Sequence, residues 1–290
     1  MKKTHDLNKS QNSNNEAHDL EVKEGKRFPF GCNWTRFLRA LNDERIAQAE
    51  QSLLEGLGTD GLLGRSFLDI GCGSGLFSLA ARRLGARVTS FDYDPQSVAC
   101  TEYLRHKFFP NDQEWIIMNG SVLDNSFCEK LGHADIVYAW GVLHHTGAMW
   151  KAIGNSMELT KVGGTLFMAL YNDQGWLSHY WTGLKRFYNR VDWIQKPLLV
   201  LHAPFFVGLR WIVRVAKGKR EDARGMSLWY DMIDWLGGWP FEVSLPGQVL
   251  EFSKKAGFRA LRIRTVDRRL GCNEFVLLRE EGHTRNSFCD

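Results

Sequence analysis

The sequence predicts an α/β domain with a doubly wound, mostly parallel sheet. Short apolar runs alternate with helical patterns from about residue 60 to residue 171, and a glycine-rich loop at 71–75 follows the first run. Near-continuous apolar strands separated by helices are typical of a parallel sheet that helices cover on both faces. The five predicted strands of this core cover residues 66–70, 87–91, 115–118, 135–140 and 165–171.

The helical patterns and the C-terminal part complete this architecture. Helices are predicted between the strands at 75–84, 95–108 and 149–159, and another at 246–256. Two β-rich segments, 258–266 and 274–278, close the chain. The short separation between them predicts a β-hairpin.

Residues 172–240 interrupt the alternation and predict a helical insertion. Seven of the 11 Trp residues lie between positions 176 and 239, which indicates an apolar lid over a ligand or an ordinary core. The apolar run 198–215 contains His202, Arg210 and Arg214. Its uninterrupted parts are shorter than the ~20 residues that a membrane-spanning helix needs. We expect a core or lid helix, and a helix on a membrane surface is the alternative because a basic cluster follows at 217–220.

The bulk composition describes an ordinary globular protein. The chain has 290 residues, of which 44% are hydrophobic and 24% charged. We expect a disordered tail over residues 1–27, which are polar and lack a signal-peptide core, and one domain over 28–290. The net charge of +4 is too small to favour nucleic acid as a partner. The six Cys residues form no Cys-x-x-Cys pair and no metal-ligand spacing, so we expect free thiols, no metal and a cytoplasmic protein.

The loop after the first strand points to an adenosine-containing ligand. It reads Asp69-Ile-Gly71-Cys-Gly73-Ser-Gly75. Glycines at these positions allow sharp turns and close approach of a ligand to the backbone, and the acid can accept hydrogen bonds. The dinucleotide fingerprint would need glycine where Leu76 stands, and the chain lacks the Gly-Lys-Ser/Thr of a phosphate-binding loop. A plain strand-to-helix turn remains the structural alternative.

The second predicted strand also ends in acidic residues. Asp92 lies 17 residues after Gly75 and is expected to accept hydrogen bonds from both hydroxyls of a ribose, with Tyr93 beside it. Asp94 directly precedes Pro95, which favours a role as the N-cap of the next helix.

Two histidines follow the fourth predicted strand. His144 and His145 stand in tandem at its end, where an imidazole could take a proton near neutral pH. Adjacent residues point in different directions, so we expect one of them to face the acceptor, and His145 is preferred. A lone histidine is more often structural.

Several stretches of the chain together resemble one protein family. The loop from Asp69 to Gly75 resembles the first motif of class I S-adenosylmethionine-dependent methyltransferases, Asp/Glu-x-Gly-x-Gly-x-Gly. The resemblance covers about residues 28–280. Within the family, the chain is similar to a bacterial benzoquinol-methylase-like subgroup that acts on small molecules. It implies a seven-stranded sheet whose last strand is antiparallel, and S-adenosylmethionine as the cofactor. The further stretches that carry it are 30–34, 171–176, 224–229, 235–242 and 271–275.

The resemblance also implies roles for further residues. Ser121 and Val122 would line the adenine, although Ser121 stands where the family often has an acid. Trp140 would lie beside the sulfonium through its backbone, and Asn33 and Trp34 would fold over the cofactor. Asp124 is expected either to reach the cofactor's amine or to cap the next helix. The acceptor-binding residues that we expect in the lid region are Tyr171, Trp229, Asp231, Trp235 and Trp239.

The sequence therefore predicts transfer of a methyl group to a small-molecule acceptor. The tryptophans favour an apolar or aromatic acceptor whose polar groups Asp231, Asp234 and Glu242 could fix. A hydroxyl of a quinol, phenol or sugar is the first choice, and a small thiol is the alternative. Basic residues such as Lys185 permit an anionic head group or are simply solvated, and we do not expect peripheral membrane contact. A catalytically inactive cofactor-binding regulator and a nicotinamide oxidoreductase are the remaining alternatives.

Overall fold

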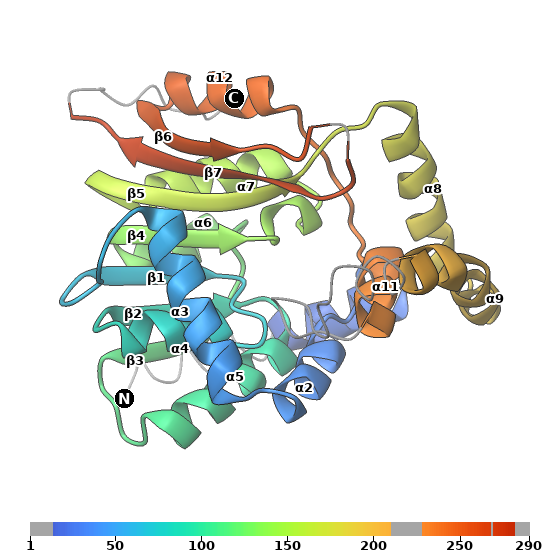
Figure 1. Ribbon diagram of the computed structural model, residues 1–290, viewed down its shortest axis with the longest axis horizontal. Helices are drawn as coiled ribbons and strands as arrows, with labels where there is room; N and C mark the ends of the chain where they lie inside the picture. The colour runs from blue at the N-terminus through green and yellow to red at the C-terminus, as the bar shows by residue number, and fades with distance from the viewer. Residues whose placement is uncertain (1–13, 210–227, 268, 282–290) are drawn as a thin grey trace.

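The computed structural model describes residues 14–209, 228–267 and 269–281. Within them, seven strands form one sheet in the order β3-β2-β1-β4-β5-β7-β6. The neighbours from β3 to β5 pair in parallel, whereas β7 runs antiparallel to both β5 and β6 (Figure 1). The strands are β1 (Ser66–Ile70), β2 (Arg87–Asp92), β3 (Trp115–Asn119), β4 (Ala134–Trp140), β5 (Thr160–Tyr171), β6 (Phe258–Arg264) and β7 (Cys272–Arg279). The predicted doubly wound fold and its antiparallel last strand are confirmed.

Helices cover both faces of the sheet, as the apolar strands require. One buried cluster joins the sheet to α3, α4 and α5, and a second joins it to α6, α7 and α12. Figure 1 shows α3, α4 and α5 in front of the sheet and α6 and α7 behind it. Their bounds are α3 (Asp43–Leu57), α4 (Leu76–Arg83), α5 (Pro95–Phe108), α6 (Asn125–Leu131), α7 (Met149–Glu158) and α12 (Pro246–Lys255).

One strand is longer than the sequence suggested. Strand β5 begins at Thr160, although the glycine pair 163–164 predicted a start at Thr165. Thr160 pairs with Ala134 and Thr165 pairs with Ile136, so an irregularity in the pairing takes up the glycines and the strand continues.

The insertion is helical and has a core of its own. Its described elements are α8 (Trp176–Arg190), α9 (Asp192–Ala203), the π-helix η2 (Pro204–Leu209) and α11 (Leu228–Gly237). Trp181, Tyr188, Met232 and Leu236 are buried together, with Phe28 from the N-terminal segment. The expected helix over 198–215 is thus split between α9 and η2, and its residues after 209 lie outside the described part.

The N-terminal segment is ordered against this domain from residue 14 onward. Residues 14–23 form a helix, and the side chain of His18 is only 4% exposed. Helix α2 (Gly31–Arg39) follows and contacts α5. The prediction of a disordered tail is therefore wrong for residues 14–27, because His18 and Arg27 have partners far along the chain. Residues 1–13 lie outside the described part.

Candidate active site

The glycine loop has a backbone conformation that its three glycines permit. Gly71, Gly73 and Gly75 have φ values of 68°, 55° and 79°. A Cβ atom on Gly75 would lie 2.8 Å from the Cα atom of Thr101, whose backbone cannot easily move. Helix α5 therefore approaches the loop more closely than a side chain at Gly75 would allow, and the bare backbone of the loop suits a ligand that lies against the main chain.

Asp69 lies at the end of β1 but belongs to a buried hydrogen-bond chain. Its carboxylate accepts a hydrogen bond from the hydroxyl of Ser78 on α4, and Ser78 in turn bonds Ser90 on β2 at 2.7 Å. The indole of Trp115 on β3 donates to Ser90 at 2.9 Å. Burial raises the pKa of Asp69 to about 7. The side chain thus connects three strands and α4, and its contact with a ligand remains a prediction.

Asp92 ends β2 and connects the glycine loop to the next turn. One carboxylate oxygen accepts from the backbone N–H of Gly73 and the other from that of Asp94, each at 2.9 Å. Burial, with a contribution from the negative charge of Asp94, raises the pKa of Asp92 to about 7. A carboxylate has about four acceptor positions, so the two hydroxyls of a ribose can still be bound.

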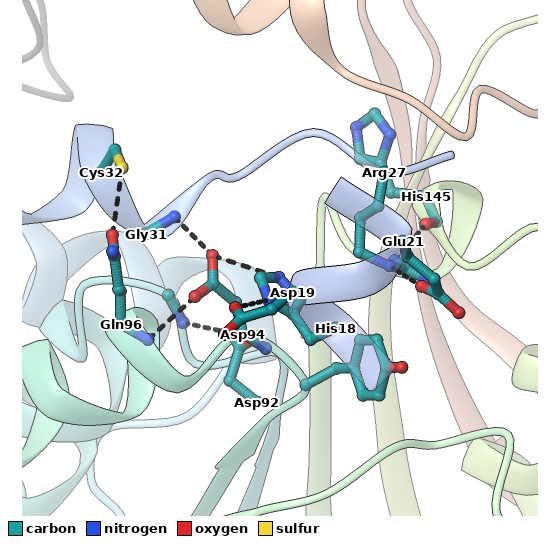
Figure 2. Close-up of polar contacts among 12 residues, drawn as sticks. His18, Asp19, Glu21, Arg27, Gly31, Cys32, Asp92, Asp94, Gln96 and His145 are labelled. Atoms are coloured by element: carbon teal, nitrogen blue, oxygen red, sulfur yellow. Dashed lines mark hydrogen bonds and ion pairs between the residues drawn. The ribbon is translucent and has the colours of Figure 1, made fainter. Parts of the chain in front are cut away.

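Asp94 has a second role that the sequence did not reveal. It caps α5 by accepting from the N–H of Gln96 at 2.8 Å, as predicted. Its other oxygen accepts from the N–H of Gly31 at 2.7 Å, and Nε2 of His18 lies 3.8 Å from it (Figure 2). One carboxylate therefore joins the N-terminal segment to the cofactor side of the sheet. These partners lie more than 60 residues away in sequence, so no local pattern could have indicated them.

The turn after β3 lies beside Asp92. Ser121 accepts a hydrogen bond from the N–H of Leu123, and Val122 is buried. Asn119 was missed: its amide donates to the carbonyls of Asp92 and Tyr93, at 3.1 and 3.2 Å. Its Oδ1 is buried without a hydrogen-bond partner among the described residues, so it offers an acceptor to a ligand. A polar residue at the end of an apolar strand was the available signal.

Asp124, for which the sequence left two roles open, caps a helix. Its carboxylate accepts from the backbone N–H groups of Ser126 and Phe127, at 2.9 and 3.2 Å, at the start of α6.

The N-terminal segment covers this edge of the sheet. The indole of Trp34 lies against the glycine loop, where a Cβ atom on Gly73 would come within 3.0 Å of its Nε1. Asn33 is buried and accepts from Arg36. Trp34 therefore lies on the side that the family resemblance implied, and contact of either residue with a cofactor remains a prediction.

Arg27 extends the same cover toward the histidines. Its guanidinium pairs with Glu21, lies 4.8 Å from the ring centre of Tyr93 and donates to the carbonyl of His145 at 3.2 Å (Figure 2). The ring of Tyr93 also packs edge-on against His18, with 5.6 Å between their centres.

The two histidines form a single 3₁₀ turn, Leu143–His145, shortly after β4. Nδ1 of His144 accepts from the N–H of Tyr171 at 3.4 Å, so Nε2 carries the proton of this buried ring. Nδ1 of His145 lies 2.6 Å from the carbonyl of Pro240. Because a carbonyl only accepts, Nδ1 of His145 carries the proton and Nε2 keeps its lone pair. Only His145 is thus prepared to receive a proton.

Both histidines are neutral at physiological pH. Burial lowers the pKa of His145 to about 3, and the positive charges of Lys185 and Arg27 add to the shift. Burial, followed by the effects of His145 and Lys185, lowers the pKa of His144 well below its usual range. Both rings are therefore uncharged at this pH, and the lowered pKa makes each a weaker base than a free imidazole.

Tyr171 is the centre of an aromatic cluster at the histidines. Its ring centre lies 3.9 Å from that of His144 and 5.2 Å from those of Trp235 and Phe241. Lys185 of α8 is fully buried there, with its ammonium 4.6 and 4.7 Å from the centres of the Trp235 and Phe241 rings. The interpretation of Lys185 as a solvated residue is wrong, because the aromatic rings of the insertion enclose it.

Two of the other expected lid residues have contacts in the structure, and the side chains of the rest lie outside the described part. The carbonyl of Trp239 accepts from the N–H of Phe28, and its ring lies 5.1 Å from the guanidinium of Arg186. The carboxylate of Glu242 accepts from the N–H of Met149 and so caps the start of α7, and its contact with an acceptor remains a prediction. The side chains of Trp229, Asp231 and Asp234 lie outside the described residues.

Trp140 ends β4 between the two halves of the site. Its indole donates to Glu274 at 3.2 Å, which leaves its backbone, followed by Gly141 with φ of 77°, at the carboxyl end of the sheet.

Comparison with known proteins agrees with this geometry. The sequence model of a family described as "Methyltransferase domain" matches residues 68–166, which include the glycine loop, Asp92 and His145. Residues 68–166 are therefore similar to a methyltransferase domain, as the sequence predicted. The glycine loop and Asp92 remain the predicted contacts for the methionine and ribose parts of S-adenosylmethionine.

Relatives and solved structures resemble different shares of the chain. A "Ubiquinone biosynthesis O-methyltransferase" of Xanthomonas campestris is 33% identical over 38% of this chain and 45% of its own length. The same-named protein of Xanthomonas oryzae is 30% identical over 47% of this chain and 52% of its own. The chain thus spans about half the length of the curated relatives it matches.

The fold itself is shared more widely. The methyltransferase in complex with the Trm112 activator of Haloferax volcanii has a TM-score of 0.52 at 13% identity, over 89% of this chain and 98% of its own. PKMT2 of Rickettsia typhi has a TM-score of 0.53 at 13% identity, over 80% of this chain and 52% of its own.

Proposed function

We propose that this protein transfers a methyl group from S-adenosylmethionine to a hydroxyl of a small apolar acceptor. The observation that carries the proposal is the bridge between the two halves of the site. Arg27 lies over Tyr93, beside Asp92, and donates to the carbonyl of His145, beside Tyr171. Cofactor and acceptor would therefore meet at one edge of the sheet.

The cofactor side would be held by the backbone and by carboxylates. The glycine loop and Asp69 would hold the methionine part, and Asp92 would accept from the ribose hydroxyls. Ser121, Val122 and the unpaired Oδ1 of Asn119 would face the adenine. When bound, this cofactor supplies an activated methyl group on a sulfonium, so the protein mainly aligns the acceptor and excludes water.

The acceptor side would select an aromatic molecule. Tyr171, Trp235 and Trp239 would provide apolar contact area, and the buried ammonium of Lys185 would favour electron-rich oxygen atoms. The curated relatives are named for ubiquinone biosynthesis, which agrees with a phenol or quinol-like acceptor.

His145 would act as the general base. Its Nδ1–H donates to the carbonyl of Pro240, which fixes the ring and its tautomer, and Nε2 would receive the proton of the acceptor hydroxyl. Because its pKa is lowered to about 3, we expect His145 to contribute about 10²-fold, the lower end of the range for general bases. His144 would support the site through packing and its bond to Tyr171.

A labelled-methyl screen tests this proposal. The protein is incubated with S-adenosylmethionine and with panels of phenols, quinols, sugars and thiols, and both labelled product and S-adenosylhomocysteine are measured. We expect transfer to a phenol or quinol that depends on His145. Transfer to thiols that is unchanged in His145→Ala would contradict the hydroxyl acceptor, and cofactor binding with no transfer to any panel would favour the inactive regulator.

A further inference from the structure

Helix α8 exposes aromatic side chains on the face opposite the acceptor side. Lys185 and Trp181 point into the aromatic cluster, whereas Trp176, Tyr180 and Phe187 are 79%, 48% and 47% exposed. These three residues recur at helical spacing, so they lie along one stripe of the helix. The exposed Arg190 lies at the edge of this stripe, and Arg186 lies beside it against the ring of Trp239.

Helix α9 is apolar on both of its faces. Leu198 is buried in the core of the insertion, yet Trp193, Val200 and Leu201 are 74%, 70% and 72% exposed. Large exposed apolar side chains that lie close together usually mark a contact with another apolar environment. Exposed Trp and aliphatic residues beside Lys196 are typical of a helix in the interfacial region of a lipid bilayer.

The described exposed charges of α8 and α9 are mostly basic. Arg186, Arg190 and Lys196 are exposed there, against the single acid Asp192. A second copy of the chain would bring these cations face to face, whereas the head groups of anionic lipids would neutralise them.

We propose that the exposed outer faces of α8 and α9 bind the protein to an anionic phospholipid surface. This lipid-binding face is Trp176, Tyr180, Phe187, Trp193, Val200 and Leu201, with Arg186, Arg190 and Lys196 among them. Among the described residues, no helix has the length and apolar character to cross a bilayer, so the contact is peripheral. The inference builds on the proposed function, since it gives an apolar acceptor a membrane from which to enter the lid.

Vesicle co-sedimentation without cofactor or acceptor tests the inference. The full chain is mixed with vesicles of phosphatidylcholine alone or of phosphatidylcholine with phosphatidylglycerol. We expect at least about 10-fold tighter binding to the anionic vesicles, with partial release at 0.5 M NaCl, because charge and apolar insertion both contribute. The double variant Trp193→Glu, Leu201→Glu should reduce binding to the level seen with phosphatidylcholine alone.

A matched control separates this face from general hydrophobicity. Leu63 is 88% exposed in the segment before β1, away from the insertion, and Leu63→Glu should leave vesicle binding unchanged. Equal loss in both variants, or no binding of the parent to anionic vesicles, would overturn the inference. The inference would also be overturned if the parent bound no vesicles but formed a dimer, and the double variant abolished that dimer.

The two proposals fail separately. Methyl transfer to a water-soluble acceptor should be unchanged in the double variant, because neither residue contacts the candidate active site. Vesicle binding without any methyl transfer would support the lipid-binding face and contradict the proposed function. Methyl transfer without vesicle binding would support the proposed function and contradict the lipid-binding face.

Discussion

The cofactor side and the acceptor side of the site are built in different ways. The cofactor side depends on backbone conformation at Gly71–Gly75 and on carboxylates that bond neighbouring main-chain N–H groups. The acceptor side depends on packing of Tyr171, Trp235 and Lys185, which belong to three separate elements. Changes on the first side should therefore affect cofactor affinity, whereas changes on the second should affect transfer.

The largest difference in effect on the transfer rate should be that between the variants of the two histidines. His145→Ala removes the proposed base, and we expect the transfer rate to a hydroxyl acceptor to fall about 10²-fold with unchanged S-adenosylhomocysteine affinity. His144→Ala instead leaves a cavity beside Tyr171 and should mainly lower the unfolding temperature. Single-turnover rates, calorimetric titration and thermal unfolding of both variants distinguish these outcomes. An unchanged rate in His145→Ala would remove base catalysis from the account.

A glycine pair tests how rigidly the cofactor loop is specified. Gly75→Ala combines a positive φ with a contact at 2.8 Å to the backbone of Thr101, so we expect about 2–4 kcal/mol of lost stability together with weakened cofactor binding. Gly58→Ala, at φ of 67° with no atom within 4 Å, should cost only about 1–2 kcal/mol. Denaturant unfolding measures both. Equal losses would mean that close packing does not constrain the loop.

The pH dependence of cofactor binding should follow the carboxylates. Burial raises the pKa values of Asp69 and Asp92 to about 7, and ribose hydroxyls favour the ionised form of Asp92. Affinity for S-adenosylhomocysteine should therefore rise with pH through about 7. Because the histidine pKa values are lowered, the histidines add nothing in this window. In Asp92→Asn the increase of affinity with pH should be smaller. An increase equal to that of the parent would mean that another group causes it.

The same two carboxyls should reduce stability as the pH increases. In the folded, ligand-free protein they keep their protons up to about pH 7. In the unfolded chain they lose them near pH ~3.9. The folded state thus binds more protons between about pH 4 and pH 7, so the contribution of these groups to the free energy of unfolding falls across that range.

The smallest effect should come from Asp124, which caps α6. Asp124→Ala should lower the free energy of unfolding by about 1 kcal/mol and leave cofactor affinity unchanged. Thermal unfolding and calorimetry check this. Weakened cofactor binding at unchanged stability would instead support a contact between Asp124 and the cofactor's amine.

The sequence predicted the sheet and the cofactor side because both depend on local patterns. Alternation of apolar strands and helices gave the parallel core, and Asp94 with Pro95 indicated the start of α5 where the structure has it. The acid and the glycines of the loop are close in sequence, so their spacing alone predicted the loop that the structure has, and their contact with a cofactor remains a prediction.

The acceptor side could not be predicted in the same way. Glu242 caps α7 from 93 residues away, and Arg27 reaches the carbonyl of His145 across 118 residues. The burial of Lys185 follows from aromatic residues of α11 and the segment after it. Such partners are chosen by tertiary packing, which no sequence spacing records.

Calorimetric titration with S-adenosylhomocysteine tests the central claim most directly. The parent and His145→Ala should bind it with equal affinity. Asp92→Asn should bind about 10–100-fold more weakly, because hydrogen bonds to a charged group are lost. Absence of binding to the parent, or equal affinity in Asp92→Asn, would contradict a cofactor site built from the glycine loop and the end of β2.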